Sequence, residues 1–149
     1  MQEERFMRFV NLIDGVHKSV QKMRVDNAAT FGIKGVHIFW VYELLQHPEG
    51  LSATELAART NIDRSLISRE ISALEAKGFI NIDKAKGKRN YNSKLTLTSS
   101  GTDAATKIKQ LAISFQNIIS SDVPERELEI FYSVLEKLYN NFEKLTEEE

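Results

Sequence analysis

Three serines and an arginine recur at helical spacing near the middle of the chain, as Ser65, Ser68, Arg69 and Ser72. Spacings of three and four residues place them on one face of a helix. Small side chains let a backbone come close to a partner surface, and arginine can donate two hydrogen bonds to a guanine edge or bind a phosphate. We expect Arg64, just before this set, to lie near phosphate. The chemistry favoured here is hydrogen bonding to nucleic acid.

The other face of the same segment is apolar, because Ile67, Ile71 and Leu74 also follow helical spacing. Asp63 is expected to cap the start of this helix through its carboxylate. Gly78 is expected to end it, where the backbone must become left-handed. The sequence therefore predicts a short helix with one buried face and one polar face.

A second short helix is predicted just before the first. Ser52 and Glu55 have the spacing of a capping box, and residues 60–62 form a brief turn between the two helices. A helix, a short turn and a second helix with a polar outer face are typical of a helix-turn-helix, although this turn lacks the glycine often found there. The alternative is an ordinary helical hairpin.

A basic hairpin is predicted directly after these helices. Residues 79–83 and 94–98 alternate between apolar and polar side chains, as short strands do, and residues 84–93 between them are basic. A loop of this kind can follow phosphates or insert an arginine into a narrow minor groove. We expect Lys86, Lys88 and Arg89 to contact DNA, with Tyr91 at the base of this wing. The alternative is a solvated charged loop.

The charge of the chain is distributed unevenly. Residues 51–98 carry nine Lys or Arg against five Asp or Glu, a net charge of +4, whereas residues 99–149 carry five against ten, a net charge of −5. The basic excess coincides with the predicted helix-turn-helix and wing. This asymmetry is typical of a phosphate-binding surface. It predicts that the affinity for nucleic acid falls steeply as the salt concentration rises.

The segments 65–69, 74–80 and 97–101 resemble the MarR family of winged helix-turn-helix transcriptional regulators. They match its recognition helix, the "L-E-x-x-G-h-I" that leads into the wing and the "L-T-x-x-G" that starts the next helix. The resemblance implies an obligate homodimer that represses transcription and is often released by a small ligand. Many members carry an aspartate two residues before the wing arginine, whereas this chain has Gly87 two residues before Arg89.

The terminal segments carry apolar stripes with spacings of three and four residues, which predict two long helices. The first stripe contains Phe6, Phe9, Ile13, Val16, Val20 and Met23, and the second contains Leu128, Phe131, Leu135, Leu138, Phe142 and Leu145. The simplest interpretation is an intramolecular helical bundle. The resemblance favours a homodimer in which these helices interlock, with two recognition helices that read a palindromic operator.

The predicted fold class is therefore mostly α with a small β-hairpin wing (α+β). We expect one domain over residues 1–149, in which residues 36–98 form the winged helix-turn-helix lobe. Residues 1–30 and 99–149 would form the helical dimerisation lobe.

Proteins that look like this one bind small aromatic or phenolic effectors between these two lobes. Arg24, His37, Trp40 and Tyr42 are candidate lining residues, because they lie near the junction of the first two predicted helices. The alternative is that Trp40 and Tyr42 belong to the core, while Arg24 and His37 lie at the surface.

Other chemistry has little support in the sequence. The chain has no cysteine, its three histidines do not form a metal-binding pattern, and it has no glycine-rich phosphate loop. We therefore expect no metal, no cofactor and no enzyme activity. No apolar run reaches the roughly 20 residues of a membrane span, and we expect no membrane partner and a cytoplasmic location. The competing function is a winged-helix protein–protein interaction module without a DNA role.

Overall fold

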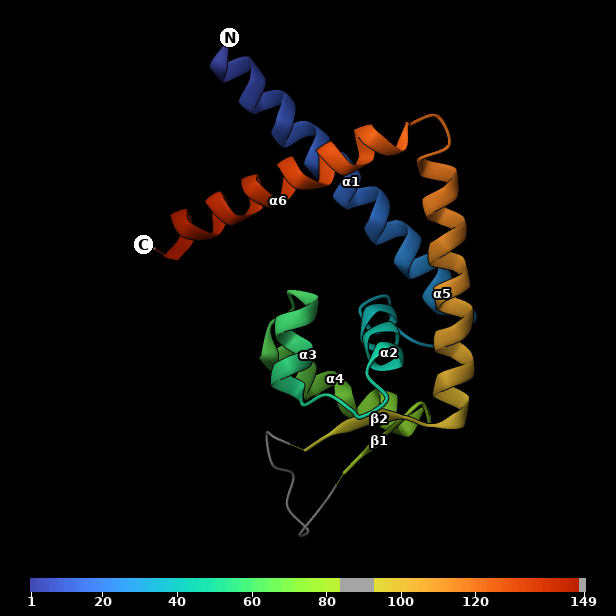
Figure 1. Cartoon of the computed structure of the whole chain (residues 1–149). Coiled ribbons are helices and arrows are strands. Elements are labelled where there is room, and N and C mark those ends of the chain that lie inside the picture. The colour runs from blue at the N-terminus through green and yellow to red at the C-terminus, as the bar shows by residue number, and fades with distance from the viewer. Residues whose placement is uncertain (84–92, 148–149) are drawn as a thin grey trace. The chain divides into compact units, whose positions relative to one another are not determined.

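The computed structural model describes residues 1–83 and 93–147. This part of the chain forms six helices and one two-stranded antiparallel sheet (Figure 1). The elements are α1 (Gln2–Thr30), α2 (His37–Gln46), α3 (Ala53–Thr60), α4 (Arg64–Ala76), β1 (Ile80–Ile82), β2 (Leu95–Leu97), α5 (Ser99–Ile119) and α6 (Glu125–Glu147). The predicted fold class, mostly α with a small hairpin, is confirmed.

The chain divides into two compact units, residues 1–109 and 110–149. The first unit contains α1 to α4, both strands and the start of α5. The second contains the rest of α5 and all of α6. The lobes predicted from the sequence, residues 36–98 and residues 1–30 with 99–149, remain predictions.

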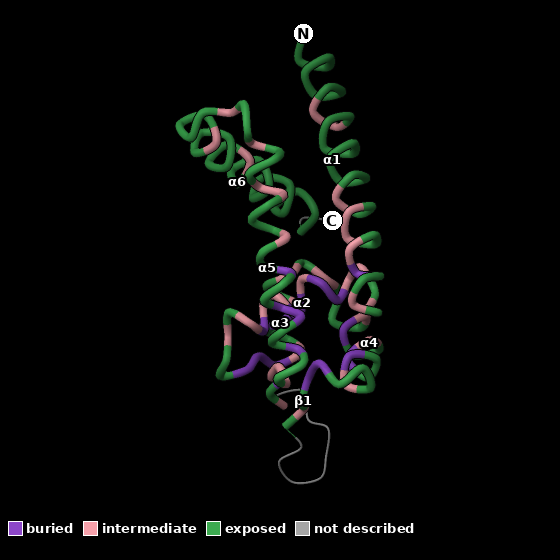
Figure 2. The backbone as a smooth tube through the Cα atoms, turned by 90° about the vertical axis from the view of Figure 1, so that its right-hand side faces the viewer, coloured by how far each residue is buried: buried purple, intermediate pink, exposed green. Residues whose placement is uncertain are grey.

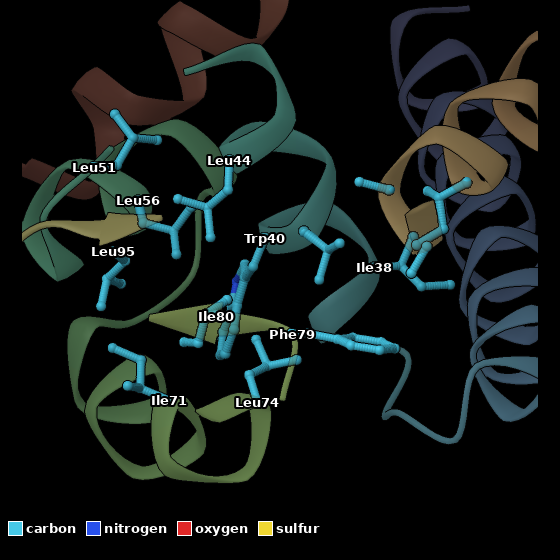
Figure 3. Packing of buried hydrophobic residues seen from close by; sticks show 14 of the residues in the cluster. Ile38, Trp40, Leu44, Leu51, Leu56, Ile71, Leu74, Phe79, Ile80 and Leu95 are labelled. Atoms are coloured by element: carbon cyan, nitrogen blue, oxygen red, sulfur yellow. The ribbon is translucent and has the colours of Figure 1, made fainter. Parts of the chain in front are cut away.

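Helix α2 lies at the centre of the first unit, because apolar side chains cover most of its surface. Trp40 and Val41 are fully buried, and Figure 3 shows Trp40 among side chains of α4 and β1. The buried segments of Figure 2 lie mainly in α2, α4, the strands and the start of α5, whereas most of α1 is exposed. The core of the first unit is therefore built around the predicted helix-turn-helix and fixes the position of its helices.

The two strands pair as predicted, with Ile80 opposite Leu97 and Ile82 opposite Leu95. An isolated bridge between Leu51 and Leu95 attaches the segment before α3 to the same sheet. The ladder continues beyond the strands, because the Asp83 amide donates to the Lys94 carbonyl at 2.9 Å. The base of the predicted wing is therefore joined to the helix-turn-helix by backbone hydrogen bonds.

Helix α6 has no buried residue within the single chain. Apolar side chains of its predicted stripe are exposed, including Phe131 at 53% and Leu138 at 37%. In α1 the stripe residues Phe6 and Val16 are also exposed, at 54% and 60%. Large apolar faces of this kind on a globular protein usually mark an interaction surface.

Candidate nucleic-acid interface

Helix α4 presents the polar face that the sequence predicted. Its exposed side chains include Arg64, Ser65, Ser68, Arg69 and Ser72. The opposite side of the helix is held in the core by side chains that are at most 8% exposed, namely Ile67, Ile71 and Leu74. The structure therefore brings the five candidate residues of this helix together on one accessible surface.

Both ends of α4 are fixed by the residues expected to do so. The Asp63 carboxylate accepts a hydrogen bond from the Ser65 amide at 2.8 Å. This hydrogen bond to the backbone lowers the pKa of Asp63. The nearby positive charge of Arg69 lowers it further. Gly78 has a φ of +81°, the left-handed conformation predicted at the end of the helix. The polar face is thus presented by a helix with defined ends.

The helix before it is capped in the same way. The Ser52 hydroxyl accepts from the Glu55 amide at 3.2 Å, and the Glu55 carboxylate accepts from the Ser52 amide at 2.7 Å. The turn that follows contains Asn61 at a φ of +51°. Asparagine tolerates this left-handed conformation better than most residues, so it replaces the missing glycine of the turn. The helix-turn-helix geometry is therefore formed without glycine.

Glu55 also connects α3 to the base of the wing, because its carboxylate lies 3.0 Å from the Lys94 ammonium. Backbone hydrogen bonding at Ser52, with the contribution of Lys94, lowers the pKa of Glu55 to about 2. The carboxylate therefore stays charged at neutral pH. It both caps α3 and pairs with Lys94 at the base of the wing.

The side chain of Arg69 lies along its own helix, because its Nε donates to the Ser65 carbonyl at 3.4 Å. A bond of this length is weak, so the side chain can reorient toward a ligand at small cost. The candidate base-reading residue therefore lies beside Ser65 on the exposed face.

Lys86, Lys88, Arg89 and Tyr91 lie outside the described residues, and their predicted DNA contacts remain predictions.

The four candidate effector residues have different surroundings in the structure. His37 and Trp40 contact each other, with ring centroids 5.3 Å apart, and are 2% and 0% exposed. Arg24 instead lies over the ring of Phe39, 4.4 Å from its centroid. Tyr42 is partly buried against the core. The alternative that placed His37 at the surface is wrong, whereas Trp40 is a core residue as that alternative expected.

Two polar atoms near this junction are buried without a hydrogen-bond partner in the described part of the chain. They are Nε of Arg24 and Nε1 of Trp40. Burial lowers the pKa of Arg24.

Two polar contacts of Glu70, in α4, were not predicted from the sequence. The Glu70 carboxylate is bonded to His37 at 3.1 Å and to the Lys34 ammonium at 2.9 Å. Glu70 and His37 are 33 residues apart in the chain, and no local spacing joins them. The only sequence signal is the position of Glu70, which borders the apolar stripe of its helix.

Within residues 1–83 and 93–147, no group of three or more His, Cys, Asp or Glu side chains could hold a metal ion. None of the helices in that same part is long and apolar enough to cross a membrane.

Comparisons with known proteins agree with this geometry. A family model described as "HTH domain" matches residues 39–91. The uncharacterized HTH-type transcriptional regulator YdgJ of Bacillus subtilis (strain 168) is 26% identical over 102 residues, which cover 68% of this chain. They cover 62% of that protein, so the match spans less than two thirds of its length.

Solved structures of low sequence identity share the fold. A MarR transcriptional regulator of Methanosarcina mazei Go1 superimposes with a TM-score of 0.76 at 19% identity, covering 93% of this chain and 99% of that one. A MarR family regulator of Listeria monocytogenes, complexed with 26mer DNA, gives a TM-score of 0.79 at 18% identity and covers 89% and 87%.

The architecture and these matches define a winged helix-turn-helix protein. Within that class, the chain has the fold of the MarR family regulators, and the resemblance predicted from the sequence is confirmed at the level of the fold.

Proposed function

We propose that this protein is a sequence-specific double-stranded DNA-binding transcriptional regulator. The observation that carries the proposal is the exposed face of α4, where Ser65, Ser68, Arg69 and Ser72 lie together on a helix capped at both ends. Small hydroxyls with one arginine suit close approach to base edges in the major groove. The net charge of +4 over residues 51–98 supports contact with phosphates. The HTH family model and the regulators of the same fold support the same function.

The proposed active form is a homodimer that binds a palindromic operator. The exposed apolar stripe of α6 supports this form, because stripe side chains such as Phe131 and Leu145 are 53% and 63% exposed in the single chain. A two-fold dimer would place two α4 helices on half-sites one DNA turn apart, roughly 34–36 Å. Repression is the outcome we propose for operator occupancy, following the family resemblance.

We further propose release by a small aromatic or phenolic effector near the junction of α1 and α2. The buried Nε of Arg24, which lacks a partner among the described residues, could donate to a phenolic or carboxylate oxygen there. Such an effector would act through a higher affinity for the form that does not bind DNA.

A salt titration of binding to random duplexes, followed by selection of the tightest binders, tests this function. The logarithm of the binding constant should fall linearly with the logarithm of the salt concentration. The expected slope is about −0.9 for each neutralised phosphate. The selected duplexes should share a palindrome with half-sites about 10 base pairs apart. Weak binding with no enriched sequence would contradict the proposal and favour a protein–protein interaction module.

A further inference from the structure

The buried imidazole of His37 bridges the loop before α2 and the recognition helix α4. Its Nδ1 lies 3.3 Å from the backbone amide of Lys34, and its Nε2 lies 3.1 Å from the Glu70 carboxylate. A backbone N–H can only donate, so Nδ1 must be the unprotonated acceptor. Nε2 then carries the hydrogen and donates it to Glu70. Both ring nitrogens are therefore satisfied in one neutral tautomer, which the hydrogen bonds assign.

Glu70 is held in a charged state on the side of α4 next to the core. Its other oxygen accepts from the Lys34 ammonium at 2.9 Å, and this contact, ahead of the one with His37, lowers the pKa of Glu70. The Lys34 side chain is 65% exposed, whereas those of Glu70 and His37 are 16% and 3% exposed. An exposed ion pair contributes little to stability, so the contact between Glu70 and the buried ring is the stronger constraint.

Apolar side chains also attach α4 to the core. Ile67, Ile71 and Leu74 bury one face of the helix, which sets its rotation about its axis only within a range, because apolar burial is non-directional. A charge-assisted hydrogen bond to a buried ring is directional. Arg69, the neighbour of Glu70 in the chain, lies on the exposed face, so a rotation of the helix would displace its guanidinium.

We propose that the hydrogen bond from His37 to Glu70 positions the recognition helix, so that its exposed face meets the base edges in register. This proposal rests on the DNA-binding function proposed above. In this proposal, neither His37 nor Glu70 contacts DNA. Both act through Arg69 and the serines of the exposed face, and they should affect discrimination between sequences more than the affinity for phosphates.

Four substitutions separate the hydrogen bond from charge and burial. Glu70→Ala and Glu70→Gln remove the same charge, but only the glutamine keeps an oxygen that can accept from Nε2. His37→Gln places an amide nitrogen near the position of Nε2, whereas His37→Asn keeps only an acceptor near Nδ1. Val41→Ala is the control, because it removes fully buried methyl groups of α2 and touches none of these polar contacts.

The experiment measures binding of each full-length variant to the selected duplex and to an unrelated duplex, together with the free energy of unfolding. Glu70→Ala and His37→Asn should each lower the affinity for the selected duplex about tenfold, the effect of one lost base contact. Their affinity for the unrelated duplex should stay within about twofold of wild type. Glu70→Gln and His37→Gln should retain the discrimination, and the double variant with Glu70→Ala and His37→Asn should lose no more than either single variant.

Three results would overturn the proposal. The first is an equal loss on both duplexes, the second is additive losses in the double variant, and the third is a loss of discrimination in Val41→Ala as large as in Glu70→Ala. If wild type shows no preference for any duplex, the DNA-binding function itself fails and this inference fails with it. If wild type discriminates but Glu70→Ala discriminates equally well, only the positioning role fails.

Discussion

Gly101 lies against the backbone of Phe79, so closely that a Cβ atom at position 101 would be 1.9 Å from the Phe79 carbonyl oxygen. The same carbonyl accepts a hydrogen bond from the Thr98 amide at 3.0 Å. Thr98 also caps the start of α5, because its hydroxyl accepts from the Gly101 amide at 3.0 Å. The first turn of α5 is therefore packed directly on the residue that precedes β1.

Replacing Gly101 with alanine should destabilise the first unit strongly. The clash is with backbone, which cannot move aside as the end of a flexible side chain can, so α5 must shift away from β1. We expect a loss of about 3 kcal/mol, the upper part of the range for overpacked sites. Denaturant unfolding of wild type and variant measures this difference.

Gly15→Ala is the matched control for this substitution. A Cβ atom at Gly15 would meet nothing within 4 Å in the single chain, and the residue lies inside α1. Alanine there should stabilise the helix by up to about 1 kcal/mol through helix propensity. Equal effects of the two substitutions would show that the contact with Phe79 is unimportant.

Asp63→Ala should lower the unfolding midpoint, whereas Asp63→Asn should leave it nearly unchanged. Both substitutions remove the charge, but asparagine can still accept the hydrogen bond from the Ser65 amide. Thermal unfolding at neutral pH compares the three proteins. A similar loss in both variants would indicate that the charge near Arg69, and not the cap, stabilises this helix.

The helix-turn-helix could be predicted from the sequence because its determinants are local. The capping box of Ser52 and Glu55, the cap at Asp63 and the left-handed Gly78 each act within a few residues. The polar face of α4 follows from the same periodicity that buries Ile67. These features need no information about the rest of the chain.

Contacts between distant segments could not be predicted in this way. The buried ring of His37 is hydrogen-bonded to Glu70, 33 residues further along the chain. The clash that makes Gly101 necessary depends on the path of Phe79. From the sequence, Gly101 could be interpreted only as part of the family motif "L-T-x-x-G". The structure gives the physical reason for a glycine at this position.

Arg69→Ala and Lys86→Ala should affect DNA binding in different ways. If Arg69 contacts a base, its loss should cost about 1–3 kcal/mol of affinity and relax the preference at one position of the site. Loss of Lys86, which lies in the predicted wing, should weaken all duplexes alike and reduce the salt slope by about one. Titrations of selected and unrelated duplexes at several salt concentrations distinguish the two. Wild-type behaviour of both variants on every duplex would refute the groove assignment.

A charge on the apolar stripe of α6 should separate the proposed dimer. Phe131→Glu or Leu138→Glu would bury a carboxylate in the interface, whose desolvation is unfavourable. Analytical ultracentrifugation should give twice the chain mass of 17.0 kDa for wild type and the single-chain mass for these variants. Ser133→Glu, which lies away from the stripe on the same helix, should remain dimeric. A wild-type protein of single-chain mass would remove the basis for a palindromic operator.

Because the buried His37 ring is neutral, we expect the free energy of unfolding to depend on pH. This dependence should occur at higher pH values than those at which carboxylates titrate. Burial, opposed by the hydrogen bond and the charge of Glu70, lowers the pKa of His37 below its usual 6.5. The unfolded chain therefore binds a proton more readily than the folded chain, so the free energy of unfolding should fall as pH decreases from about 6.5 toward the folded pKa. The pKa of Glu70 is lowered from 4.5, so its own contribution is lost only at more acidic pH. The variant His37→Gln cannot titrate and should lack the decrease between about pH 7 and pH 5. Denaturant unfolding of both proteins across this range is the measurement, and parallel curves would mean that His37 does not determine the response.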